Sequence, residues 1–285
     1  MDAKSTIKRS LFTYPGSKRK LAPQYAKLFP KHSLFVSAFA GSAAEFSFKP
    51  PAKREILNDL DGNIYSVFAT LRDERLYQRL LRLLKYSHDC RRLYFECHDR
   101  LKEKGLSILE RAFNFLVAAN LGFQGVHPLM TRSYTWGLNN KRKRIHTVIP
   151  ALHAWRNRMK HVECENIDAF DLIDKYDYPD TLFFLDPPYH LATRAKSLYL
   201  HDVFDHGRFV RLLQKLKGKV FLCGYEHGLY DIQLLGWRRI VIPTIKTACG
   251  LRAPRREIVW MNYDENGQII KQDLKLINSF EKLTA

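Results

Sequence analysis

The tetrapeptide Asp186-Pro187-Pro188-Tyr189 brings together the residue types best suited to chemistry in this chain. The carboxylate of Asp186 and the backbone carbonyl of Pro187, held rigid by its ring, are two acceptors at fixed positions. Together they suit an exocyclic amine, which offers two N–H donors. The ring of Tyr189 adds a flat face on which a planar base can stack. The motif therefore predicts a pocket for an extruded adenine.

An apolar run before the motif predicts where it lies. Residues 181–185, Thr-Leu-Phe-Phe-Leu, are typical of a short buried parallel strand. Two prolines cannot donate to a sheet ladder, so the strand must end at Asp186. Open α/β sheets bind their ligands at the carboxyl ends of strands, and we expect the motif at that edge.

The composition indicates a globular protein with a polyanionic partner. The chain has 285 residues, of which 46% are hydrophobic, and 47 Lys and Arg outnumber 29 Asp and Glu to give a net charge of +18. That excess favours nucleic acid. No stretch is apolar enough to span a bilayer, the first ten residues lack a signal core, and five cysteines suggest no disulfide framework. We expect a protein of the cytoplasm, without membrane contact.

Two histidines and two cysteines lie close together in the sequence and could in principle hold a zinc ion. His88, Cys90, Cys97 and His98 lie in a helical pattern and lack paired CxxC spacing. We therefore predict no metal.

The first part of the chain carries two patterns that suit an anionic ligand and a cofactor. Residues 14–18, Tyr-Pro-Gly-Ser-Lys, predict a turn running into a helix that Ser17 caps and that continues to Phe29. Residues 33–44 predict a buried strand, a tight loop of small residues and a helix start, where a Rossmann-like fold lets a cofactor approach the backbone.

Two later strands each end in an acid. Residues 54–59 predict a strand ending at Asp59, which lies roughly 20 residues after the small-residue loop, an offset typical of an acid that binds ribose. Asp59 and Asp61 can instead cap the next helix. Residues 161–168 predict a strand ending at Asp168, and Asp168 or Asp171 can cap the helix at 171–175.

Taken in order with the tetrapeptide, these elements resemble the D12 class, the Dam-type N6-adenine DNA methyltransferases of the α group, over most of the chain. The resemblance implies a Rossmann-like S-adenosylmethionine-dependent methyltransferase fold, with a mixed, mainly parallel sheet flanked by helices. It implies S-adenosylmethionine as methyl donor, S-adenosylhomocysteine as product and no metal. The implied cofactor-binding residues are Tyr14, Gly16, Lys18, Phe39, Ala40, Gly41, Ser42, Asp59, Asp168 and Asp186.

The cofactor loop departs from the family pattern at two points. Ser37 and Ala38 stand where the family commonly has Glu-Pro, so one acidic cofactor contact is unaccounted for. Ala43 stands where a second glycine is usual, although alanine is small enough to keep the loop.

The resemblance also divides the chain. Residues 1–65 form the cofactor-binding part of the catalytic domain, 66–150 a basic helical target-recognition insertion, and 151–285 the part with the tetrapeptide. In the insertion and around the tetrapeptide, basic, amide and aromatic side chains suit contacts to phosphate and bases. A nuclear-localisation signal is the competing interpretation of residues 141–144. The predicted DNA-binding residues are Asn120, Gln124, Arg132, Tyr134, Lys141, Arg142, Lys143, Arg144, Arg194 and Lys196.

We therefore expect a site-specific methyltransferase, acting as a monomer or a dimer, that modifies the N6 amine of a flipped adenine in double-stranded DNA. Two alternatives remain open. The departures at Ser37 and Ala43 also fit a catalytically impaired nucleic-acid-binding protein on the same fold. The charge fits an RNA adenine methyltransferase equally well. The sequence leaves the recognition site open, as it does the choice between a restriction-modification, phage or orphan enzyme.

Overall fold

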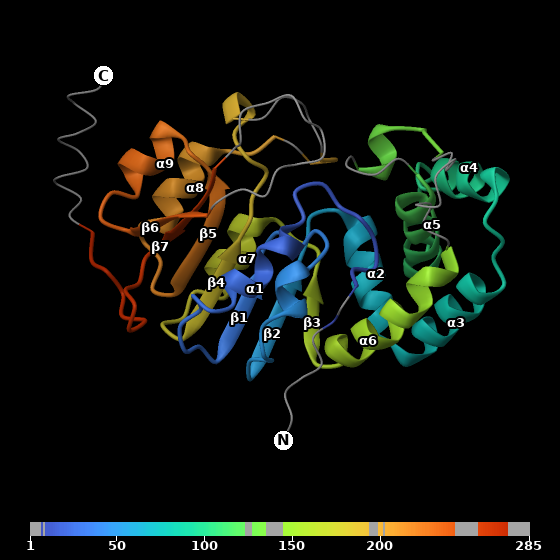
Figure 1. Cartoon of the computed structure of the whole chain (residues 1–285), viewed down its shortest axis with the longest axis horizontal. Helices are drawn as coiled ribbons and strands as arrows, with labels where there is room; N and C mark the ends of the chain where they lie inside the picture. The colour runs from blue at the N-terminus through green and yellow to red at the C-terminus, as the bar shows by residue number, and fades with distance from the viewer. Residues whose placement is uncertain are drawn as a thin grey trace.

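The computed structural model describes residues 7, 9–122, 127–134, 145–193, 199–201, 203–242 and 256–272. Their strands form one seven-stranded sheet of order β3-β2-β1-β4-β5-β7-β6, with helices on both faces (Figure 1). Only β7 runs against its neighbours, β5 and β6. The mixed, mainly parallel sheet predicted from the sequence is confirmed. The strands are β1 (Leu34–Ser37), β2 (Arg54–Asn58), β3 (Val162–Glu165), β4 (Thr181–Leu185), β5 (Lys219–Tyr225), β6 (Arg238–Ile242) and β7 (Glu257–Met261).

Side-chain caps fix where most helices begin. Asp61, Asp73 and Asp205 each accept a backbone N–H of the first turn, and Ser107 forms a reciprocal capping box with Glu110. Among the described helices, none is long and apolar enough to cross a membrane. The helices are α1 (Ala22–Tyr25), α2 (Gly62–Arg72), α3 (Glu74–Lys85), α4 (Arg91–Arg100), α5 (Ile108–Leu121), α6 (Ile149–Met159), α7 (Ala169–Lys175), α8 (His206–Leu213) and α9 (Gly228–Gln233).

The alternation of side chains along the strands divides the interior into two cores. In β4, Phe184 belongs to the core on one face and Phe183 to the core on the other. The first core continues from the sheet into α2 to α6, where Phe68 packs against Trp155. Helices α3, α4 and α5 therefore extend the protein beyond β3 without interrupting its core (Figure 1). Their role in target recognition stays a prediction.

The helix predicted after the first turn is shorter than expected. The chain forms a 3₁₀ turn, η1 (Lys18–Lys20), and then the four residues of α1. Pro23 has no backbone N–H and fits only the first turn of a helix, so it separates the two elements. The predicted cap was also wrong: Ser17 caps no helix, and its Oγ lies 2.8 Å from the Oγ of Ser42. This contact joins the first turn to the small-residue loop.

Candidate active site

A cavity of about 360 Å³ opens at the carboxyl ends of the central strands. Three of its walls are the sequence patterns found above: the first turn, the small-residue loop and the acids after β2 and β3. Asp186 and Pro188, which follow β4, also line it. The fold thus joins segments that are far apart in the sequence. The wall residues include Tyr14 to Lys18, Ala38 to Ser42, Ala44, Glu45, Asn58 to Asp61, Asp168 to Phe170, Tyr199, Phe204 and Arg208.

Asp186 is paired with a buried lysine. The Nζ of Lys18 lies 3.0 Å from Oδ1 of Asp186 and 3.3 Å from Oε1 of Glu257, and the Lys18 side chain is only 8% exposed. Burial alone would lower the pKa of Lys18, but the two carboxylates hold it well above its ordinary value. Burial raises the pKa of Asp186 to about 6, against the opposing effect of Lys18. Near neutral pH Asp186 is therefore mostly charged.

The tyrosine of the tetrapeptide is fixed by the same acid. Its hydroxyl donates to Oε1 of Glu257 over 2.6 Å, and Tyr25 donates to that oxygen over 3.3 Å. The ammonium of Lys18 lies 4.6 Å from the centre of the Tyr189 ring, within the range of a cation–π contact. Glu257 therefore sets the positions of both Lys18 and Tyr189.

The small-residue loop curls tightly against the first turn. Gly41 has φ +48°, and a Cβ added there would lie 2.9 Å from the ring of Tyr14. Ala43 adopts φ +50°, in the left-handed region that favours glycine. This conformation explains why a glycine is usual at position 43, and it shows that alanine keeps the loop at the cost of backbone strain.

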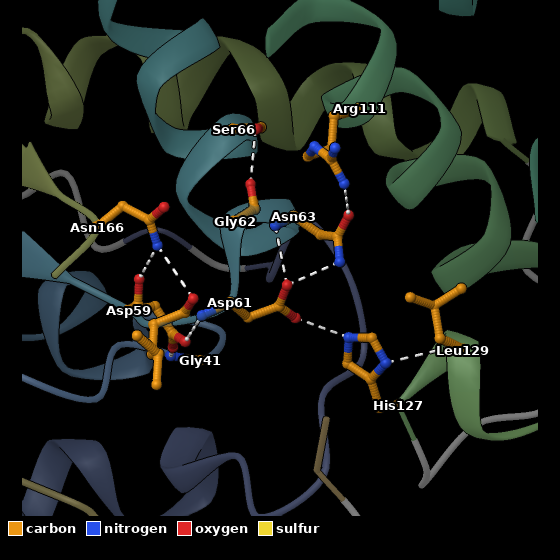
Figure 2. A network of polar contacts seen from close by, with 11 residues as sticks. Gly41, Asp59, Asp61, Gly62, Asn63, Ser66, Arg111, His127, Leu129 and Asn166 are labelled. Carbon is orange, nitrogen blue, oxygen red and sulfur yellow. Dashed lines mark hydrogen bonds and ion pairs between the residues drawn. The ribbon is translucent and has the colours of Figure 1, made fainter. Parts of the chain in front are cut away.

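The acids after β2 have separate tasks (Figure 2). Asp59 accepts the backbone N–H groups of Gly41 and Asp61 over 2.8 and 2.9 Å. Asp61 instead caps α2 by accepting the N–H of Asn63 over 2.9 Å. Burial, followed by the charge of Asp61, raises the pKa of Asp59 to about 7. Of the two candidate helix caps, Asp61 is the one used, and Asp59 lines the cavity.

A buried histidine connects Asp61 to the segment after α5 (Figure 2). His127 Nδ1 accepts the N–H of Leu129 over 3.2 Å, so its proton lies on Nε2. Nε2 then donates to Oδ2 of Asp61 over 2.7 Å. The cavity wall and residues 127–130 are therefore joined by hydrogen bonds.

Asp168 has both of the positions that the sequence suggested, at the start of a helix and on the cavity wall. Its side chain accepts the N–H of Phe170 over 2.8 Å and so caps α7. The residue also lines the cavity beside Phe170. Asn58 holds this loop against β1, since its amide donates to the carbonyls of Ala38 and Ile167 over 3.0 and 3.1 Å.

The predicted DNA-binding residues that the structure describes lie apart from the cavity wall. Asn120 is buried, and its amide donates to the carbonyls of Leu11 and Leu116, so its geometry does not support a DNA contact. Arg132 is exposed and pairs with Asp99 over 2.7 Å. Tyr134 packs 5.5 Å from the ring of Tyr94. The remaining predictions lie outside the described residues: Gln124, Lys141, Arg142, Lys143, Arg144, Arg194 and Lys196.

Sequence reasoning missed two acids of the site. Glu257 opens β7 and reaches Lys18 only through the pairing of β7 with β5. Glu45 lies in the 3₁₀ turn η2 (Ala44–Ser47) and lines the cavity. Its signal was a lone acid in a run of small and apolar residues, Ala43 to Phe48.

Comparison with known proteins agrees with this geometry. A relative, the modification methylase LlaI of Lactococcus lactis subsp. lactis, is 24% identical over an alignment of 288 residues. The alignment covers 90% of this chain. The chain spans 44% of that relative's length. The family model of the D12 class N6 adenine-specific DNA methyltransferases matches residues 14–223, from the first turn to β5. That match takes in the cavity wall and the tetrapeptide, and it shows that the chain belongs to the D12 class of N6 adenine-specific DNA methyltransferases.

Proposed function

We propose that this chain transfers a methyl group from S-adenosylmethionine to the N6 amine of an adenine flipped out of duplex DNA. The observation that best supports this proposal is the position of Asp186, which follows β4, lines the cavity and pairs with Lys18. An acid placed there, with its charge kept by a buried cation, is an acceptor for an amine beside a ligand pocket.

The cavity suits the methyl donor in shape and in chemistry. Gly41 leaves room where any side chain would strike Tyr14. Asp59 is available for ribose hydroxyls, and Asp168 with the ring of Phe170 for the adenine ring. When bound, S-adenosylmethionine supplies a methyl group on a sulfonium. Tyr14, Gly16, Lys18, Phe39, Ala40 and Ser42 complete the proposed binding surface.

The tetrapeptide prepares the target amine. Asp186 and the carbonyl of Pro187 accept its two N–H groups, which turns the nitrogen lone pair toward the methyl group. The same acceptors stabilise the positive charge that develops on the amine during transfer. Stacking on Tyr189 offsets part of the cost of flipping, by about 1–3 kcal/mol. In this mechanism Lys18 holds the Asp186 carboxylate in its charged form.

We propose DNA rather than RNA as substrate because of the family to which the chain belongs. The net charge of +18 supports a nucleic-acid partner of either kind. We also propose that the chain works as a monomer, without a metal, in the bacterial cytoplasm. The modification methylase among its relatives makes restriction-modification the first biological context to test.

The decisive experiment is tritium transfer from labelled S-adenosylmethionine to unmethylated duplex DNA, with the nucleosides identified after digestion. Asp186→Ala should abolish label in N6-methyladenine while leaving the circular dichroism spectrum unchanged. Asp180→Ala is the matched control, because Asp180 is exposed and precedes the opposite end of β4. It should methylate DNA like the wild type.

Each alternative function has its own outcome. Binding of DNA without cofactor binding or transfer would support the impaired binding protein. Cofactor binding with transfer to RNA alone would support the RNA enzyme. Label in N4-methylcytosine would contradict the assignment of adenine.

A further inference from the structure

The acids of the cavity wall differ in their partners. Asp186 pairs with Lys18, Asp61 with His127, and Asp168 caps a helix. Asp59 accepts two backbone N–H groups. In the described part of the chain, Glu45 forms no ion pair with a lysine or arginine.

Glu45 is nevertheless deeply buried and held in one position. The residue is 4% exposed, and the hydroxyl of Ser37, at the end of β1, donates to its Oε1 over 2.6 Å. Burial raises the pKa of this carboxyl to about 7, and the charge of Asp186 adds to the effect. The hydroxyl of Ser37 and a backbone N–H oppose this rise in pKa, but both donors are neutral. Lys49 also lowers this pKa, but its ammonium is paired with Glu55. Among the described residues, no cation lies within ion-pair distance of Glu45.

The position of Glu45 also accounts for the departure at the end of β1. Ser37 stands where the resemblance led us to expect an acidic contact to the cofactor. The structure brings a carboxylate to that place from eight residues further along, and the Ser37 side chain binds it. Serine is short enough to leave room for the incoming Glu45 side chain.

We propose that Glu45 binds the α-ammonium group of the methyl donor, and that Ser37 is its positioning residue. This inference rests on the proposed function, because it assumes an S-adenosylmethionine-type ligand in the cavity.

The ammonium is the group whose chemistry suits this position best. It brings the missing positive charge and offers three N–H donors to the carboxylate. A sulfonium brings a charge but no N–H. Ribose hydroxyls bring donors but no charge, and Asp59 is already placed to accept them.

The test compares two ligands by isothermal titration calorimetry. S-adenosylhomocysteine has the α-ammonium and no sulfonium, and 5′-methylthioadenosine keeps the adenosine and sulfur but lacks the ammonium. Glu45→Gln should lower the affinity for S-adenosylhomocysteine about tenfold to a hundredfold, as expected for the loss of a charge-assisted hydrogen bond. The affinity for 5′-methylthioadenosine should change less than about twofold. Glu265→Gln, an exposed acid in the turn after β7, is the control and should change neither.

Two further variants test the positioning role of Ser37. Ser37→Ala should weaken S-adenosylhomocysteine but not 5′-methylthioadenosine, a difference that a general loss of fold would not produce. Combining Ser37→Glu with Glu45→Ser returns the carboxylate to the end of β1 and should recover at least part of the lost affinity.

Several outcomes would overturn the proposal. Equal loss for both ligands in Glu45→Gln would mean that the acid only supports the fold. If S-adenosylmethionine is titrated in parallel, a loss of affinity for it but not for S-adenosylhomocysteine would assign Glu45 to the sulfonium. Failure of the wild type to bind either ligand would overturn the proposal together with the proposed function. If the wild type methylates DNA while Glu45→Gln binds normally, only this inference fails. If the binding pattern holds without methyl transfer, the proposed function fails and the inference stands.

Discussion

Replacing Lys18 by methionine should expose how strongly the active site depends on one buried cation. Lys18 lies between Asp186 and Glu257 at 3.0 and 3.3 Å, so one buried cation pairs with two acids. Methionine keeps the length of the side chain and removes the charge. The carboxyl groups of Asp186 and Glu257 then have no cation between them. Tyr25 and Tyr189 still donate to Glu257.

The expected cost is set by the loss of a buried partner. Breaking a buried ion pair from one side destabilises proteins by about 3–5 kcal/mol. The variant can reduce this cost by keeping a proton on one carboxyl. Asp186 already has its pKa raised to about 6 by burial, in spite of Lys18, and losing Lys18 must raise it further.

The sign of the pH dependence follows from this shift. A carboxyl whose folded pKa lies above its unfolded value retains a proton in the folded state, so the free energy of unfolding falls as pH rises through that interval. For the wild type this fall ends near pH 6, because Asp186 is then charged. In the variant it continues to higher pH. The deficit of Lys18→Met relative to the wild type should therefore be small near pH 5.5 and approach about 3 kcal/mol near pH 8.

Urea denaturation followed by circular dichroism at the two pH values measures this deficit. Lys20→Met, an exposed lysine of the same 3₁₀ turn, is the control and should change the free energy of unfolding by less than about 0.5 kcal/mol. Adding Glu257→Gln to Lys18→Met should restore much of the stability, because one buried charge then remains instead of two. An equal deficit at both pH values, or no recovery in the double variant, would refute the reasoning.

Three further predictions follow from the cavity wall. Ala43→Gly should raise the free energy of unfolding by about 0.5–1 kcal/mol in urea denaturation, since relief of the φ of +50° outweighs the entropy of glycine; a loss would contradict the strain. Gly41→Ala should weaken S-adenosylhomocysteine in calorimetry because of the clash with Tyr14, whereas Gly105→Ala, with φ +78° and open space around it, should leave affinity unchanged. Single-turnover methyl transfer should fall about tenfold per pH unit below pH 6, as Asp186 takes up a proton. A flat profile between pH 5 and 7 would argue against an acceptor role for the charged acid.

Local patterns predicted the elements that end at the cavity. Apolar runs located the central strands, and the acids at 59 and 168 both line the pocket. Sequence spacing also placed Gly41 in a tight loop. These features depend on a few neighbouring residues, which is why a sequence pattern can reveal them.

Contacts between distant segments were beyond such patterns. Nothing near Glu257 indicates that it will meet Lys18, because that contact depends on the position of β7 between β5 and β6. The same holds for Ser17, which contacts Ser42 instead of capping a helix. Asn120 had the right residue type for DNA but is used inside the fold.

The position of β7 also has a consequence for how the protein is made. Tyr25 and Glu257 are 232 positions apart, and their contact closes a loop of most of the chain. A nascent polypeptide can pair β1, β2 and β4 long before β7 leaves the ribosome. Lys18 would then be synthesised early, long before Glu257, one of the two acids that it pairs with. The methyl-acceptor side should therefore mature late during translation, and we expect the growing chain to be unable to modify DNA until β7 has inserted.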